Sequence, residues 1–210
     1  MSDYIRRLPV YLLLDCSGSM SGEPIEAVKQ GIKALLTELK GDPQALETAC
    51  LSVITFNSTA RQMTELMLFK EPELIAGGAT ALGGALHVLA DCIRTEVRTS
   101  TATQKGDWKP LVFLLTDGAP TDNLDEGIEA LKSVSTGNII ACAAGANANT
   151  NTLRKITNNV LMMNNLTAGD LAAFFAWVSG SIKASSKSID AKPGEAIQLP
   201  PPPQGFVIVP

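Results

Sequence analysis

The sequence is poor in the residues on which several large classes of site depend. Its 210 residues include a single histidine, and its four cysteines (Cys16, Cys50, Cys92 and Cys142) lie far apart with no CxxC spacing. Zinc sites are built largely from cysteine and histidine, and disulfide frameworks need paired cysteines in a short chain. The sequence therefore argues against a zinc centre, and we expect the four thiols to be reduced residues of the hydrophobic core.

Long hydrophobic runs and clusters of basic residues are also missing. No stretch approaches the roughly 20 apolar residues of a membrane helix, and the polar N-terminus leads into an apolar run too short for a signal sequence. The 17 basic and 21 acidic residues give a formal net charge of −4, without any cluster of Lys and Arg among aromatic residues. We expect a cytoplasmic protein with no membrane span and no nucleic-acid partner.

The remaining composition is that of a folded protein. Hydrophobic residues make up 45% of the chain and charged residues 18%, and a chain of this length can bury a sizeable core. From about residue 185 the sequence turns to Ser, Lys, Pro and Gly. We expect one domain over residues 1–185 and a flexible, extended, proline-rich tail over residues 186–210, outside the core; docking of the apolar end of this tail is the alternative.

The order of hydrophobic patterns predicts the fold class. Residues 8–14 and 111–115 are wholly apolar runs, typical of strands buried on both faces of a parallel sheet. We expect further strands at residues 50–56, 60–68, 138–144 and 160–163, and helices at residues 25–39, 82–97, 124–135, 152–158 and 168–184. A tight turn precedes residues 60–68, which makes them an antiparallel edge strand. The sequence thus predicts a doubly wound α/β fold: a mostly parallel six-stranded sheet with helices on both faces.

Oxygen-bearing side chains follow the two apolar strands. Asp15, Ser17 and Ser19 stand at alternate positions directly after the first strand, so all three point the same way. Asp117 follows the second strand, and Thr80 lies in a glycine-rich loop just ahead of a helix. Ligands of open α/β sheets bind beyond the carboxyl ends of the strands. We therefore expect the three loops to converge on one site.

Two carboxylates and three hydroxyls suit Mg²⁺ or Mn²⁺, both of which prefer oxygen ligands. Ca²⁺ is less favoured, because an EF-hand loop starting at Asp15 would need glycine where Met20 stands. This donor set leaves the ion under-coordinated and under-neutralised, so an acidic group of another protein can complete it. The loops around Glu23, Asn57, Thr80 and Asp122 would then frame the contact.

The three motifs together resemble the von Willebrand factor A domain with its metal-ion-dependent adhesion site. That family has an apolar strand ending in Asp-x-Ser-x-Ser, a threonine in a glycine-rich loop, and an apolar strand ending in Thr-Asp-Gly. The matching positions here are Asp15, Ser17, Ser19, Thr80 and Asp117, and the pattern covers about residues 5–184. The resemblance implies a non-catalytic, metal-dependent interaction module. It also implies that the hydroxyls touch the ion while Asp15 and Asp117 act largely through bound water.

Residues 8–15, 22–26 and 55–57 further resemble the small bacterial TerY-type proteins of tellurite-resistance gene clusters. This resemblance implies an intracellular stress-response role. The partner that supplies the Glu or Asp would be another Ter-cluster protein or an associated kinase or phosphatase.

An enzyme is the alternative hypothesis. Aspartyl-phosphate phosphatases of the haloacid-dehalogenase type also begin with an apolar strand ending in Asp, but their Asp-x-Asp motif needs a second carboxyl as general acid. Ser17 occupies that position, and serine is a poor general acid near neutral pH. Residues 18–22 miss the G-x-S-x-G spacing by one residue, and no P-loop is present. We expect His87 to be a surface partner of Asp91 and not a catalytic residue.

Overall fold

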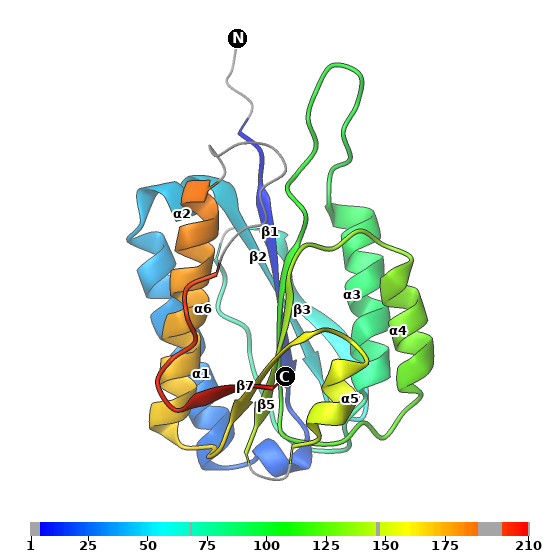
Figure 1. The fold of residues 1–210 in the computed structure, drawn as a ribbon, viewed down its shortest axis with the longest axis vertical. Coiled ribbons are helices and arrows are strands. Elements are labelled where there is room, and N and C mark those ends of the chain that lie inside the picture. Colours follow the sequence, from blue (N-terminus) through cyan, green and yellow to red (C-terminus); the bar gives the residue numbers. More distant parts are fainter. Residues whose placement is uncertain (1–4, 68, 146–147, 189–198, 210) are drawn as a thin grey trace.

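The computed structural model describes residues 5–67, 69–145, 148–188 and 199–209 (Figure 1). A seven-stranded sheet of order β3-β2-β1-β4-β5-β6-β7 runs through the middle of the molecule. Its strands are β1 (Leu8–Asp15), β2 (Ala49–Phe56), β3 (Ala60–Met67), β4 (Leu111–Thr116), β5 (Ile139–Ala144), β6 (Asn159–Met163) and β7 (Phe206–Val209). The helices are η1 (Gly18–Met20, a 3₁₀ turn), α1 (Glu23–Lys40), α2 (Pro43–Thr48), α3 (Leu82–Glu96), α4 (Leu124–Lys132), α5 (Thr150–Arg154) and α6 (Ala168–Ser188).

The two apolar runs form neighbouring central strands. Every residue of β1 and β4 is buried, and β1 lies parallel to both β2 and β4. Helices cover both faces of these strands, so neither face meets water and the run of apolar residues is unbroken. Leu14 lies opposite Leu115, so both strands end at the same edge of the sheet. This register places the loops that begin after Asp15 and Thr116 side by side.

Helices cover the sheet in two layers. Helices α1, α2 and α6 lie on one face, and α3, α4 and α5 lie on the other (Figure 1). Alternate residues of β1 serve the two layers: Leu12 and Leu14 pack with α1 and α6, whereas Tyr11 and Leu13 pack with α3. None of the helices in the described ranges is long and apolar enough to cross a bilayer.

The sheet has seven strands where six were expected, and both of its edge strands are antiparallel where one was expected. Residues 206–209, expected in a tail outside the core, form β7, which pairs antiparallel with β6. Phe206 and Leu199 pack against the core, and the Trp177 Nε1–H donates to the Pro200 carbonyl at 3.0 Å. The apolar, β-branched run Phe-Val-Ile-Val has strand propensity, which the prolines before it obscured. Helix α6 continues to Ser188, past the expected division at residue 185, and residues 189–198 and 210 of the tail lie outside the described residues.

The remaining helices and strands lie within a few residues of their expected positions, although Leu68, expected to end the third strand, lies outside the described residues. Helix α2 was not expected from the sequence. It begins with Pro43 at a position where the missing N–H costs nothing, and the Asp42 side chain accepts a hydrogen bond from the Ala45 N–H at 3.0 Å. Its six residues are too few to show a helical hydrophobic period.

Candidate metal centre

Asp15 is fully buried at the end of β1, with its carboxylate fixed by neutral donors. Its Oδ1 accepts from the Ser17 N–H at 2.8 Å, and its Oδ2 accepts from the Thr116 hydroxyl at 2.5 Å. Among the described residues no cationic side chain forms an ion pair with it. A buried carboxylate without a compensating cation is costly, so this position favours the arrival of a positive ion.

The hydroxyls of the loop after β1 form a short row of oxygens that ends at Asp117, in the loop after β4. The Ser17 and Ser19 Oγ atoms are 3.0 Å apart, and the Ser19 hydroxyl donates to Asp117 Oδ1 at 2.8 Å. Neighbouring ligands of an octahedral Mg²⁺ ion, with metal–oxygen distances near 2.05 Å, are separated by about 2.9 Å. The oxygens therefore already have the spacing that a small hard cation requires.

Asp117 carries the second carboxylate of the cluster. Burial raises the pKa of Asp117 above its ordinary value, the hydrogen bond from Ser19 lowers it in part, and the charge of Asp15 raises it further. Two carboxylates thus disfavour each other's charge in a half-buried site. A divalent cation between them would remove this repulsion.

Thr80 reaches the same cluster of oxygens from the glycine-rich loop before α3. Its side chain is buried, and its Oγ1 lies 3.4 Å from the point where a Cβ on Gly118 would stand, beside Asp117. Backbone hydrogen bonds join this loop to the loop after β1: Gly18 N–H donates to the Gly78 carbonyl and Gly77 N–H to the Cys16 carbonyl, both at 2.9 Å. The five expected residues therefore lie at the end of β1 and on three loops that hydrogen bonds hold together.

Two residues that hold Thr80 in place were not singled out for that role from the sequence. The Thr121 hydroxyl accepts from the Thr80 N–H at 3.1 Å, and the Thr121 N–H donates to the Thr80 carbonyl at 2.9 Å. Asp122, expected only near the rim, accepts from the N–H groups of Gly83 (2.9 Å) and Gly84 (2.7 Å) and so caps α3. These partners are about 40 positions apart, so no local pattern reveals them. In the sequence, Asp122 stands just before α4 and resembles an ordinary acidic residue near a helix start.

Glycine is required at the point where α3 starts. A Cβ on Gly83 would lie 2.3 Å from the Asn123 carbonyl oxygen, a distance that would push α3 away from the loop carrying Thr121 and Asp122. The close approach of the two backbones is what allows one carboxylate to cap two N–H groups. The geometry at Thr80 therefore depends on residues with no ligand atom of their own.

The other candidate residues lie away from the oxygen cluster. His87 is exposed on α3, and Asp91 forms its ion pair with Arg94 at 2.5 Å, not the expected pairing with His87. All four cysteines are free. Burial, followed by the charge of Asp15, raises the pKa of Cys16 to about 12, so the free thiol beside the site stays protonated near neutral pH.

Comparison with known proteins places this geometry in a family. The sequence matches the von Willebrand factor type A domain over residues 10–175. A 121-residue segment is 34% identical to an uncharacterized protein of Synechocystis sp.; it covers 55% of this chain and 27% of that protein. The match thus spans about a quarter of the length of this relative.

Two solved structures share the fold at low sequence identity. A von Willebrand factor type A structure from Catenulispora acidiphila aligns with a TM-score of 0.65 at 20% identity, over 86% of this chain and 43% of that one. Proximal thread matrix protein 1 from the mussel byssus, whose structure has a zinc-occupied MIDAS motif, aligns with a TM-score of 0.61 at 20% identity, over 84% of this chain and 48% of that one. From the match over most of its length, the chain belongs to the von Willebrand factor type A domain family.

Proposed function

We propose that the chain holds one divalent cation on Asp15, Ser17, Ser19, Thr80 and Asp117 and uses it to bind an acidic residue of a partner protein. Domains of this family generally act as metal-dependent protein–protein interaction modules. The observation that carries the proposal is the row of oxygens from Ser17 through Ser19 to Asp117, spaced 3.0 and 2.8 Å, beside a buried Asp15 that has no cationic partner in the described part of the chain.

The chemistry of the donors favours Mg²⁺ or Mn²⁺ over softer ions. Every candidate ligand is a carboxylate or hydroxyl oxygen, and none of the described His, Cys, Asp and Glu residues gathers in threes as in a zinc or calcium cage. The hydroxyls carry no charge, so two carboxylates at most neutralise the ion. By the resemblance, Asp15 and Asp117 act largely through bound water, so a Glu or Asp of the partner adds the anionic ligand in direct contact with the ion.

The cellular setting follows from the resemblance to TerY-type proteins and belongs to the same proposal. The partner would be a Ter-cluster protein or an associated kinase or phosphatase, acting in the cytoplasm of a bacterium under tellurite or related stress. A deletion strain complemented with the wild type or with Asp117→Asn tests this part. Equal tellurite sensitivity with and without the wild-type gene would contradict it.

Phosphate hydrolysis by an aspartyl nucleophile fits the geometry poorly. A nucleophile must reach the phosphorus atom, whereas Asp15 is fully buried and both of its oxygens accept hydrogen bonds. We expect no turnover of a generic phosphoester with Mg²⁺ or Mn²⁺. Turnover that Asp15→Asn abolishes would replace the binding hypothesis with the enzymatic one.

Calorimetric titration with Mg²⁺ and Mn²⁺ tests the metal site, and capture of partners from a native bacterial lysate with Mg²⁺ or chelator tests its use. Wild type should bind one ion, and Asp117→Asn should bind it at least about tenfold more weakly. Asp125→Asn is the matched control, because Asp125 is an exposed acid of α4 whose nearest cation, Lys155, is 3.8 Å away. Metal affinity that is the same in all three proteins would refute the proposed ligand set.

A further inference from the structure

A cleft of about 340 Å³ opens beside the metal-site loops, at the end of β2 and the start of β3. One wall is β3, with Arg61 and Met63; the other is the segment after β3, with Glu73 and Ile75. The second wall is firmly seated, since Phe69 and Leu74 of the same segment are buried in the core beneath α1 and α6. The core therefore holds the second wall of the cleft in place.

The inner end of the cleft belongs to the metal-site loops themselves. Gly77 lines it, and the Gly77 N–H donates to the carbonyl of Cys16, which stands between Asp15 and Ser17. Asn57 lines it too, and its carbonyl accepts from the Ala81 N–H, next to Thr80, at 2.7 Å. A peptide with one acid on the metal site would therefore place neighbouring residues in this cleft.

The walls have a definite chemistry. Ile75 is 72% exposed, more than any other large apolar side chain described, and Met63 lies half-buried across from it. Covering such a side chain removes apolar surface from water and so favours an apolar occupant. Arg61 forms no ion pair with any described residue, and its guanidinium suits a carboxylate. Glu73 repels an acid from the opposite wall, which confines a second carboxylate to the β3 side.

We propose that this cleft selects the partner by the residues that flank its metal-binding acid. The occupant is an acidic peptide segment in which a large apolar side chain packs on Ile75 and Met63 and a second carboxylate pairs with Arg61. The inference rests on the proposed metal-dependent binding and adds to it the sequence that the partner must carry.

An array of short synthetic peptides tests this selection without knowledge of the partner. Each peptide has a Ser/Gly background and one central Glu, and each neighbouring position carries Leu, Phe, Ser, Glu or Lys in turn. Wild-type protein is applied with Mg²⁺ and again with chelator. We expect the strongest magnesium-dependent binding where a Leu or Phe stands at one fixed offset and a second Glu at another.

Two variants link these preferences to the two walls. Ile75→Ser should weaken binding of the Leu and Phe peptides about tenfold, to the level of the Ser peptides. Arg61→Glu should reverse the charge preference, so that Lys peptides bind better than Glu peptides at that offset. The matched controls are Ile208→Ser, at an exposed isoleucine of β7, and Arg154→Glu, at an exposed arginine of α5.

The outcomes separate this inference from the function on which it rests. Acidic peptides that bind with magnesium can do so without any preference for the neighbouring residues, or with preferences that both cleft variants retain. Either result refutes the role of the cleft and leaves the proposed metal-dependent binding standing. Absence of magnesium-dependent binding to every acidic peptide overturns both. Calorimetry should give the wild-type magnesium affinity for Ile75→Ser and an equal or higher one for Arg61→Glu, whose negative charge attracts the ion. Retained magnesium binding excludes unfolding as the cause of a lost preference.

Discussion

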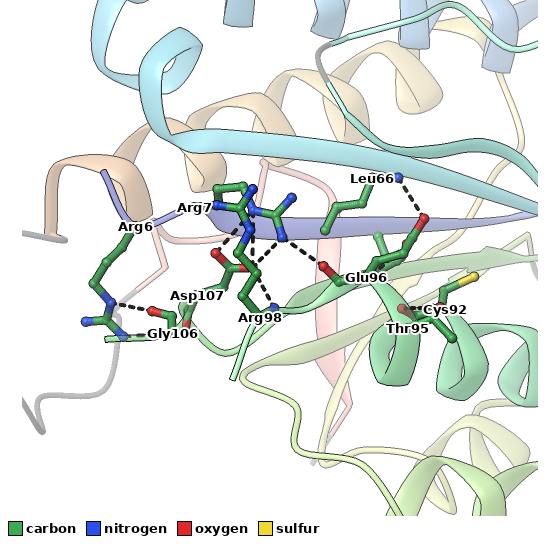
Figure 2. Close-up of polar contacts among 10 residues, drawn as sticks. Arg6, Arg7, Leu66, Cys92, Thr95, Glu96, Arg98, Gly106 and Asp107 are labelled. Atoms are coloured by element: carbon green, nitrogen blue, oxygen red, sulfur yellow. Dashed lines mark hydrogen bonds and ion pairs between the residues drawn. The ribbon is translucent and has the colours of Figure 1, made fainter. Parts of the chain in front are cut away.

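The two ends of β1 bury carboxylates in opposite ways. At the amino end, Asp107 has no exposed side-chain surface and accepts from Arg7 Nε at 3.1 Å and Arg7 Nη2 at 2.6 Å, and from the Arg98 N–H at 2.8 Å (Figure 2). At the carboxyl end, the partners of Asp15 and Asp117 are hydroxyls and backbone N–H groups. The carboxylate of Asp107 is thus already neutralised by an arginine, whereas Asp15 and Asp117 have no cationic side chain among their described partners.

Glu96 also lies at the amino end, although neutral donors and not an arginine bind its carboxylate. Its Oε1 accepts from Gln62 Nε2 at 2.9 Å and from the Leu66 N–H at 3.0 Å, and its Oε2 accepts from the Tyr11 hydroxyl at 3.0 Å. The Glu96 carbonyl accepts from Arg7 Nη2 at 2.8 Å, as Figure 2 shows. This one residue joins β1, β3 and α3, so the amino end has little capacity left for an outside ligand.

The largest expected effect on stability comes from removing the acid at the amino end. Asp107→Ala removes the buried carboxylate that pairs with Arg7 and accepts from the Arg98 N–H. The free energy of unfolding should fall by about 3–5 kcal/mol, as when one member of a buried pair is lost. Urea denaturation measures this, and an unchanged midpoint would show that the two ends do not differ in the way described.

The matching change at the carboxyl end should act on metal affinity and spare stability. Asp117→Asn should weaken Mg²⁺ binding about tenfold to a hundredfold in calorimetry. In chelator its unfolding free energy should equal or exceed that of wild type, because the amide removes the repulsion from Asp15. A metal-free variant that is clearly less stable than wild type would mean that Asp117 is structural, as Asp107 is.

Asp122→Ala should affect both stability and metal affinity, because Asp122 caps α3 beside the loop that carries Thr80. Loss of the carboxylate that accepts from two N–H groups at the start of α3 should lower the unfolding free energy by about 1–2 kcal/mol in urea denaturation. Because this cap holds the loop that carries Thr80, magnesium affinity should fall as well, by less than in Asp117→Asn. Asp122→Asn retains an acceptor and should recover part of both losses, an outcome that a simple charge effect on the metal would not give.

The smallest expected effect comes from Tyr11→Phe. It removes one of three hydrogen bonds to the Glu96 carboxylate and should lower the unfolding free energy by about 1 kcal/mol. Magnesium affinity should not change, because the hydroxyl lies at the amino end. A shift in metal affinity would show that the two ends of the strand are coupled.

The parts of the fold that sequence reasoning predicted are those with a local cause. The apolar runs of β1 and β4 reflect burial on both faces, and each can be read within a dozen residues. The expected strand alternation of Asp15, Ser17 and Ser19 is wrong, because β1 ends at Asp15. Ser17 is the N-cap of η1 and Ser19 lies within this 3₁₀ turn, so the turn brings the hydroxyls beside Asp15. Metal ligation by these side chains stays a prediction until an ion is titrated.

The parts that were missed depend on partners far apart in the chain. Asp107 and Glu96 could not be matched to Arg7 and Tyr11, which stand 85 to 100 positions away. Asp122 gives no sign that it caps a helix that begins 40 residues earlier, and β7 returns to β6 only after a proline-rich stretch. Such pairings are decided by the assembled sheet, so only the structure reveals them.

The two edges of the sheet differ in how open they are to other chains. Edge β3 carries the charged Arg61 and Glu65, has an irregular register against β2, and has its Leu66 N–H already bonded to Glu96. Edge β7 is a short apolar strand on which Val207 and Ile208 are 51% and 60% exposed. Charges and bulges discourage strand addition, whereas an apolar edge invites it. Self-association at high concentration should therefore start at β7, on the edge of the sheet away from the β3 cleft.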